Sequence, residues 1–264
     1  MPLSLDGNSL TITETCGAAR APTADVSLAA GARAAMERSR AVVDRLAAGD
    51  DPIYAVNTGV GLLAGVRIPR EQLDQLQRNV VRSHAAGVGE PLARAVVRAM
   101  MLIRANVLAK GFSGIRPLIA DRLCEMLGRG VTPVVPSQGS VGASGDLAPL
   151  AHVALVLIGE GEAEFEGAVL EGGEALRRAG IEAVELHPKE GISLINGTQA
   201  MLAVGCLELE AAETLANTAD VIAALTVDAQ RGTPRAFDPR IHQARPQAGQ
   251  LVSAERLVRF YKNH

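Results

Sequence analysis

The segment Gly139–Leu150 places one serine among very small residues, in a spacing that permits an unusual backbone reaction. Ala143 and Gly145 flank Ser144, so no large side chain hinders the Gly145 nitrogen as it approaches the Ala143 carbonyl carbon. That approach closes a five-membered ring. Loss of water from the ring and from the serine side chain would leave a methylidene-imidazolone, an electrophile that no side chain provides. The ordinary alternative is a flexible turn in which Ser144 or Asp146 caps a helix.

The elements on either side of this serine are expected to position it. Residues 131–145 carry no charge and contain two prolines and three glycines, which predicts irregular backbone that is buried or lines a cavity. An apolar helix is expected from Asp146 through Ile158, with Pro149 in its first turn. The positive N-terminal end of that helix would favour electron density on the oxygen of a ring at residues 143–145.

Four further motifs carry a likeness to a known family. In chain order they are Tyr54–Gly61, Arg82–Gly89, Leu108–Pro117 and Ile195–Gln199. With the serine segment, their order and spacing across residues 5–250 make the chain resemble the histidine, phenylalanine and tyrosine ammonia-lyase family. The resemblance implies an enzyme that eliminates ammonia from an aromatic amino acid. It also implies a methylidene-imidazolone formed autocatalytically from Ala143-Ser144-Gly145, with no metal and no nucleotide.

The resemblance also implies roles for four other residues. Tyr54 corresponds to a catalytic tyrosine, the base for the β-proton, and His84 to the selector of the substrate ring. Asn196 would hydrogen-bond the substrate carboxylate or the ring oxygen, and Gln199 would be a neighbouring partner in substrate binding. Three of them have an ordinary alternative: Tyr54 as a satisfied core tyrosine, His84 as a structural histidine, and Asn196 as the cap of a helix.

His84 makes histidine the implied substrate and trans-urocanate the product, as in histidine degradation. A tyrosine or phenylalanine lyase, or an aminomutase, is the alternative within the family, since Ser83-His84 also suits relatives that act on tyrosine. An alternative from another class is a non-catalytic helical subunit or an inactive fragment.

The chain departs from the family pattern in several places. The family usually has glycine where Ala55 stands and phenylalanine where Val60 stands, and Gln247 replaces the usual histidine after Arg245-Pro246. Family members are longer, and the part without a counterpart here carries a second catalytic tyrosine, an arginine for the substrate carboxylate and the rest of a helical bundle. Because family sites are assembled from neighbouring subunits, a homotetramer is the implied partner state.

Composition sets the fold class. Hydrophobic residues make up 48% of the chain and aromatic residues 2%, which predicts an aliphatic, mainly α protein. The expected architecture is an N-terminal mixed domain with short strands at residues 1–110, followed by the first part of a long-helix bundle at residues 111–264. A short strand is expected at 53–56 and one uninterrupted helix between Cys206 and Arg231.

Charge and cysteine usage exclude several classes of function. The chain has 26 basic and 29 acidic residues, a net charge of −3 without long runs of either sign, so neither nucleic acid nor a membrane surface is an expected partner. Three scattered cysteines fit no disulfide frame, and five scattered histidines fit no metal site. With no signal peptide and no run of about 18 apolar residues, a cytoplasmic location is expected.

Overall fold

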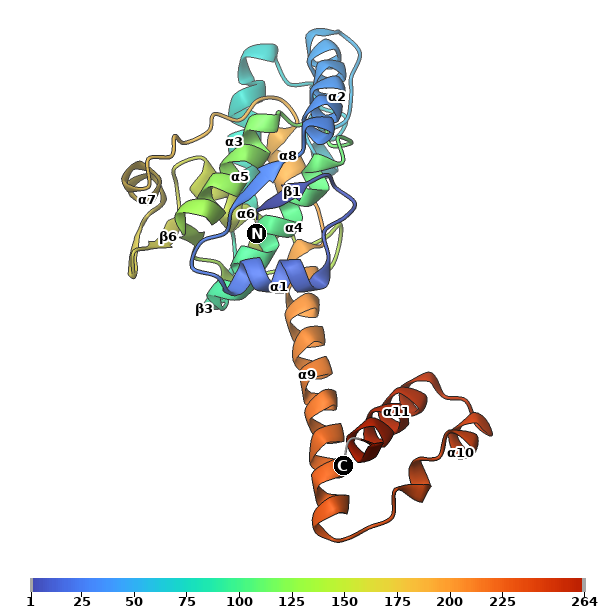
Figure 1. The fold of residues 1–264 in the computed structure, drawn as a ribbon. Helices are drawn as coiled ribbons and strands as arrows, with labels where there is room; N and C mark the ends of the chain where they lie inside the picture. The colour runs from blue at the N-terminus through green and yellow to red at the C-terminus, as the bar shows by residue number, and fades with distance from the viewer. Residues whose placement is uncertain (1, 263–264) are drawn as a thin grey trace. The chain divides into compact units, whose positions relative to one another are not determined.

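The computed structural model describes residues 2–262 and confirms a mainly α fold with a few short strands (Figure 1). The α-helices are α1 (Ile12–Arg20), α2 (Ala30–Ala48), α3 (Leu73–His84), α4 (Arg94–Ala109), α5 (Pro117–Arg129), α6 (Leu147–Leu157), α7 (Gly172–Arg178), α8 (Glu190–Ile195), α9 (Gln199–Ala229), α10 (Pro239–Gln243) and α11 (Ala248–Lys262). The strands are β1 (Leu3–Leu5), β2 (Val26–Leu28), β3 (Val88–Pro91), β4 (Thr132–Pro133), β5 (Pro136–Gln138), β6 (Glu162–Phe165) and β7 (Ala168–Glu171). Short 3-10 helices lie at Gly61–Leu63, Arg70–Gln72 and Pro234–Phe237.

Contacts divide the chain into two compact units, Met1–Leu207 and Glu208–His264. The boundary expected after residue 110 lies inside the first unit, where α4 packs against α5 across that position. The two-domain division at that residue stays a prediction.

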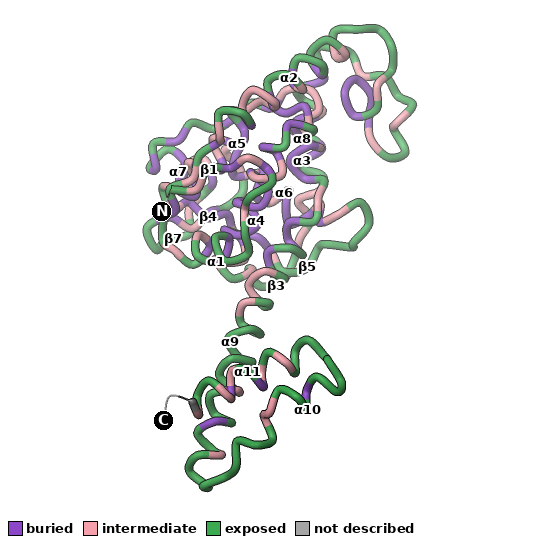
Figure 2. The backbone as a smooth tube through the Cα atoms, turned by 45° about the vertical axis from the view of Figure 1, so that its right-hand side comes forward, coloured by how far each residue is buried: buried purple, intermediate pink, exposed green. Residues whose placement is uncertain are grey.

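The core of the first unit forms around α4. This helix packs against α1, α2, α5 and α6, so it is buried on nearly every side (Figure 2). The surrounding helices have clear end signals. A capping box between Thr11 and Glu14 begins α1, and Pro117 begins α5, which ends at Gly130 in the left-handed conformation (φ +78°). Burial of aliphatic side chains therefore stabilises this unit, as its composition predicts.

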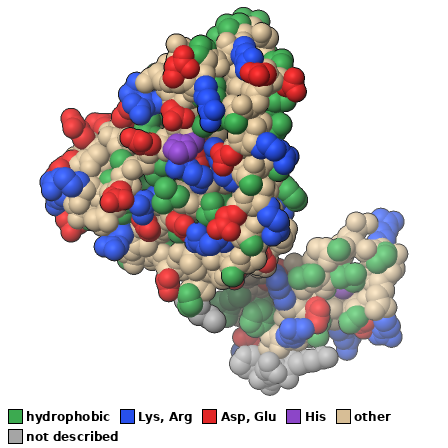
Figure 3. Space-filling view, turned by 90° about the horizontal axis from the view of Figure 1, so that it is seen from above, with side chains coloured by type: hydrophobic (Ala, Val, Ile, Leu, Met, Phe, Trp, Pro, Cys, Tyr) green, Lys and Arg blue, Asp and Glu red, His purple; other side chains and the backbone are tan. Residues whose placement is uncertain are grey.

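Three small sheets tie loops to these helices. β1 pairs with β2 in parallel, β3 with β5 antiparallel, and β4, β6 and β7 form an antiparallel meander. The β3–β5 pair matters most here, because it joins the segment after α3 to the segment that leads into residues 143–145. Acidic and basic side chains are interspersed over the face in Figure 3, as the small net charge predicts.

The strand expected at 53–56 is wrong: these residues form turns. The amides of Val56 and Asn57 donate to the Ile53 carbonyl at 3.1 and 3.2 Å, and the Ile53 amide donates to Asn57 Oδ1 at 2.7 Å. Because the segment satisfies its own backbone groups, it needs no partner strand.

Helix α9 starts seven residues before the helix expected from Cys206, because Gly205 is accommodated inside it. From Leu209 to Leu225 its apolar side chains are largely exposed, with Leu215 at 71% and Leu225 at 64%. The segment Glu190–Ala229 is long and apolar enough to cross a membrane by length and composition, a test that core helices in water also pass.

The second unit packs the end of α9 against the segments that follow it. The rings of Phe237 and Tyr261 stack with centroids 6.2 Å apart, and the Tyr261 hydroxyl donates to the Ala224 carbonyl at 2.7 Å. His242 is buried between the Ala236 carbonyl and the Gln250 side chain, at 3.1 and 2.9 Å. The 3-10 helix Pro234–Phe237 and α10 form the connection between α9 and α11.

Candidate active site

Residues 143–145 lie between β5 and α6, in a backbone conformation that ordinary turns avoid. Ser144 has φ +61° and Gly145 has φ +114°, so a serine occupies the left-handed region that favours glycine. A Cβ atom on Gly145 would overlap Gly197, lying 2.8 Å from its carbonyl carbon. The Asp146 amide donates to the Gly197 carbonyl oxygen at 2.6 Å. The structure therefore brings the serine segment against the turn that follows Asn196.

Asp146 fastens this junction from the other side. Its buried carboxylate accepts the Ser140 hydroxyl at 2.7 Å through Oδ1 and the Met201 amide at 2.9 Å through Oδ2. Asp146 occupies the N-cap position of α6, as the ordinary interpretation expects, but its side chain makes no capping hydrogen bond there and binds the first turn of α9 instead. The N-termini of α6 and α9 both meet at this junction, and their partial positive charges favour developing negative charge there.

The two candidate residues of the Ile195–Gln199 motif differ in exposure. Asn196 is exposed at the C-terminal end of α8, and its backbone amide donates to the Ile192 carbonyl at 3.0 Å. Gln199 is only 3% exposed, and its Oε1 accepts a hydrogen bond from Arg104 Nη1 at 2.9 Å. Asn196 is thus accessible from solvent, whereas the Gln199 carbonyl oxygen is occupied by an arginine.

His84 is the last residue of α3 and is half-buried. Its Nδ1 lies 2.7 Å from the Val80 carbonyl oxygen, an arrangement that favours a proton on Nδ1. Three residues later, the Gly87 amide donates to His152 Nε2 on α6 at 3.2 Å, and burial lowers the pKa of His152. Close packing at Gly87, where a Cβ would lie 3.2 Å from Pro136 Cβ, holds the loop after His84 beside β5.

Tyr54 lies in a separate loop, residues 53–68, which contains none of the other site residues described above. It is 58% exposed, and its hydroxyl accepts a long hydrogen bond, 3.5 Å, from the Gly61 amide. Ala55 beside it has φ +58°, a second non-glycine residue in the left-handed region. Within residues 2–262, the hydrogen bonds of residues 53–68 all end inside 49–68. No hydrogen bond of a described residue joins this loop to residues 143–145.

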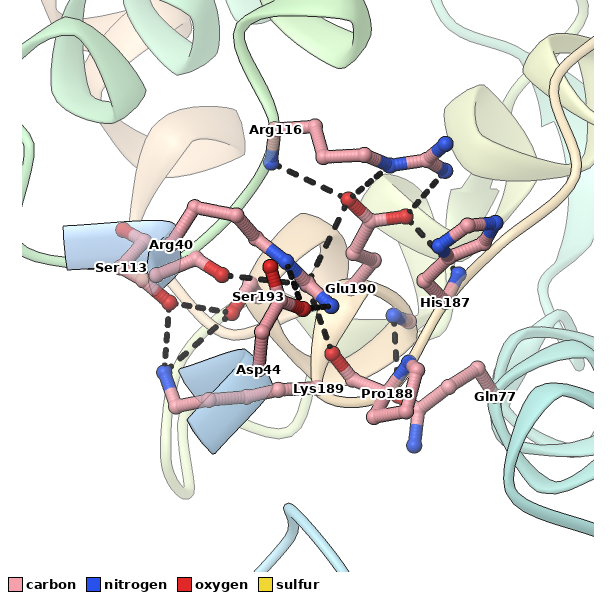
Figure 4. Close-up of polar contacts among 12 residues, drawn as sticks. Arg40, Asp44, Gln77, Ser113, Arg116, His187, Pro188, Lys189, Glu190 and Ser193 are labelled. Carbon is pink, nitrogen blue, oxygen red and sulfur yellow. Dashed lines mark hydrogen bonds and ion pairs between the residues drawn. The ribbon is translucent and has the colours of Figure 1, made fainter. Parts of the chain in front are cut away.

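The Leu108–Pro117 motif anchors α8, which carries Asn196 at its end. Glu190, fully buried at the start of α8, accepts hydrogen bonds from Arg116 Nε at 2.8 Å and Nη2 at 2.6 Å (Figure 4). Arg40 lies 3.6 Å from the same carboxylate. Lys189 donates to the Ser113 carbonyl at 2.6 Å, so the motif contacts α8 at two points.

Reasoning from sequence missed Arg104 and Glu190 as parts of this region, and it gave Asp146 only the role of a helix cap. The available signal for Arg104 was a charged residue inside an otherwise apolar helix. Arg98 gives the same signal on the same helix, so the sequence could not separate them.

Comparison with known proteins matches residues 10–264 to the family described as aromatic amino acid lyase. The chain is 58% identical over 258 residues to histidine ammonia-lyase of Koribacter versatilis, covering 98% of this chain and 50% of that protein. It is 56% identical to histidine ammonia-lyase of Anaeromyxobacter sp., covering 97% of this chain and 51% of that protein. The chain thus spans about half the length of the curated relatives it matches.

Two solved structures resemble it along nearly its whole length. Histidine ammonia-lyase from Trypanosoma cruzi superposes with a TM-score of 0.91 at 38% identity, covering 97% of this chain and 50% of that one. Tyrosine aminomutase from Streptomyces globisporus superposes with a TM-score of 0.91 at 40% identity, covering 97% of this chain and 48% of that one. By the extent of the family match and the level of these identities, the chain belongs to the aromatic amino acid lyase family.

Proposed function

We propose that this chain forms the ring-bearing part of a histidine ammonia-lyase, which converts L-histidine to trans-urocanate and ammonia. The observation that carries the reaction class is the serine segment, with Ser144 at φ +61° and Gly145 pressed against Gly197. The choice of histidine is supported by His84 and by relatives named histidine ammonia-lyase at 56–58% identity.

The residues present fit a methylidene-imidazolone. In its formation the Gly145 nitrogen bonds to the Ala143 carbonyl carbon, whose oxygen leaves as water with the amide hydrogens of Ser144 and Gly145. The Ser144 hydroxyl leaves as a second water with the hydrogen of its own Cα. Positive φ angles at both residues and the absence of space for a Cβ on Gly145 support this assignment. The ring supplies an electrophilic carbon that activates the substrate's amino group as a leaving group.

The chain's own side chains bind the substrate and move protons. Tyr54, which is exposed, accepts the β-proton as its phenolate and becomes the neutral phenol. His84 contacts the substrate ring through Nε2, since its Nδ1 faces the Val80 carbonyl. Asn196, exposed at the end of α8, hydrogen-bonds the substrate carboxylate or the ring oxygen. Gln199 acts on substrate binding from its buried position beside Arg104, by holding the turn that carries Asn196.

More than one chain completes this site. Tyr54 belongs to a self-contained loop, and the apolar side chains of α9 at Leu215, Ile222 and Leu225 are exposed. An exposed apolar surface of this kind is normally covered by another helix. We infer a homo-oligomer, a tetramer as in the family resemblance, located in the cytoplasm and acting on a small amino acid without nucleic acid, membrane, metal or nucleotide.

Product analysis tests the proposal. The purified chain, alone and mixed with the C-terminal half of a histidine ammonia-lyase, is incubated with L-histidine and with L-tyrosine in parallel. Urocanate from histidine in either preparation supports the proposal. The 40% identity to a tyrosine aminomutase favours a second candidate, which a β-amino acid from tyrosine would establish in its place. No product from either substrate, with or without the added half, would favour a non-catalytic helical subunit and contradict the proposal.

A further inference from the structure

We propose that Arg104 is a positioning residue for ring formation, because its guanidinium clamps both ends of the turn that presses on Gly145. The inference rests on the proposed function and names a residue of α4 that does not belong to the serine segment. The hydrogen bonds of Arg104 in the described chain go to Ser193 and Gln199 and not to residues 143–145, so it acts through the turn that carries Gly197.

The guanidinium of Arg104 bridges two helices. Its Nη2 donates to the Ser193 carbonyl on α8, and its Nη1 donates to the Gln199 side chain at the start of α9 at 2.9 Å. The turn of residues 196–198 lies between these two acceptors. A Cβ on Gly197 would overlap both Arg104 Nη1 and the Gln199 side chain, so the arginine packs directly against this turn.

The turn transmits this constraint to the serine segment. The Gly197 carbonyl oxygen accepts the Asp146 amide at 2.6 Å and occupies the space where Gly145 would carry a Cβ. Gly145, at φ +114°, is therefore packed closely against Gly197, and the hydrogen bond from Asp146 holds the two segments together. Since the Gly145 nitrogen must reach the Ala143 carbonyl carbon, fixing Gly197 favours the approach that closes the ring.

Burying the charged guanidinium of Arg104 is energetically unfavourable. It is 3% exposed, its Nε has no hydrogen-bond partner in the described chain, and no described carboxylate forms an ion pair with it. Burial lowers its pKa to about 10, which leaves it charged at neutral pH. A buried cation without a counter-ion is unfavourable, and Arg98 on the same helix is buried in the same way. The hydrogen bonds of Arg104 differ in that they reach the two helices beside the Gly197 turn.

Arg98 offers a matched control on the same helix. It is fully buried, and burial lowers its pKa to about 10 as well. Its Nη2 donates to the Ala18 and Leu127 carbonyls, both at 3.3 Å, near the ends of α1 and α5 and outside the serine segment. Loss of Arg98 should thus perturb the core without loosening Gly197.

The experiment compares the purified wild-type chain with Arg104→Met, Arg104→Lys and Arg98→Met. Intact-mass spectrometry measures the fraction of each protein that has lost two waters, and thermal unfolding measures stability. We expect the ratio of dehydrated protein to full-mass protein to fall at least about tenfold in Arg104→Met, because this variant loses hydrogen bonds from a charged group. Arg104→Lys keeps the charge and one hydrogen bond, so its ratio should lie between those of the wild type and Arg104→Met. Arg98→Met should be as fully dehydrated as the wild type, even if its unfolding midpoint drops.

The outcomes separate the two proposals. A wild-type chain that keeps its full mass overturns the proposed ring, and with it this inference. A dehydrated wild type with equal dehydration in both Arg104 variants overturns the inference alone. If Arg104→Met does not fold, Arg104→Lys decides. An Arg98→Met protein that loses dehydration to the same degree would reduce Arg104 to a general contributor to stability and also overturn the inference.

Discussion

Five described non-glycine residues have positive φ, and two of them, Ala55 and Ser144, are held in that conformation in opposite ways. Ala55, at φ +58°, sits in a loop whose hydrogen bonds stay within residues 49–68. Ser144, at φ +61°, sits beside Gly145 and Asp146, which contact Gly197 and Met201 more than fifty residues along the chain. Only the second conformation is imposed by distant elements.

This difference separates local strain from strain that is built into the fold. A conformation that α6, α8 and α9 together enforce can persist against its cost and promote a backbone reaction. A conformation enforced by one loop can relax within that loop. We therefore expect changes near Ser144 to alter chemistry and changes at Ala55 to alter stability.

The largest expected effect is the complete loss of ring formation in Ser144→Ala, because the serine alone supplies the methylidene carbon. Ala143 and Ser144 are exposed, so helical content by circular dichroism should stay unchanged. Ser137→Ala, at an exposed serine of the neighbouring strand β5, is the control and should keep the mass deficit. Loss of fold in Ser144→Ala would count against the assigned role.

Tyr54→Phe should lower ammonia release by about 10²–10⁴-fold when the chain is mixed with the C-terminal half of a histidine ammonia-lyase, while the ring still forms. Its hydroxyl makes a single long hydrogen bond of 3.5 Å, so stability should hardly change. The other tyrosine provides the opposite control: Tyr261→Phe loses a 2.7 Å hydrogen bond and should cost about 1 kcal/mol of stability without affecting dehydration. Undiminished activity in Tyr54→Phe would remove this residue from the mechanism.

Ala55→Gly should raise the free energy of unfolding by about 1 kcal/mol, because glycine adopts φ +58° without a Cβ clash. Ala64→Gly, three residues after Gly61 and at φ −57°, is the control and should lower stability by about 0.5–1 kcal/mol. Denaturant unfolding distinguishes them. If both substitutions destabilise equally, the strain assigned to Ala55 is absent.

The smallest expected effect is a pH dependence at His152. Burial lowers its pKa, so the unfolded chain binds this proton at a higher pH than the folded chain does. The contribution of neutral His152 to the free energy of unfolding is fully present above about pH 6.5, the ordinary pKa of histidine. It declines as the pH falls below that value. Thermal midpoints between pH 7 and pH 5 should drop less in His152→Gln than in the wild type. An identical drop in both would rule out His152 as the cause.

The sequence predicted two helices from apolar runs that are bounded by glycine or proline. The helix expected from Asp146 through Ile158 is α6 (Leu147–Leu157), and the one expected from Cys206 to Arg231 lies within the longer α9 except for its last two residues. Local patterns failed at residues 53–56, where a short apolar run is equally compatible with a strand or a turn.

The candidate site divides in the same way. The motifs name Ser144 and Asn196, and the structure joins their segments through Gly197. The Asp146 carboxylate accepts an amide of the first turn of α9, and Arg104 rather than Arg98 reaches this junction. Both facts depend on contacts between helices that are distant in sequence, which no local pattern encodes.

The most direct measurement is the mass of a proteolytic fragment of the wild-type chain that contains residues 143–145. A fragment lighter than its translated sequence by two waters, with every other fragment at full mass, is the expected result. A fragment at full mass from the folded protein would contradict the claim that the fold drives this tripeptide to condense with itself.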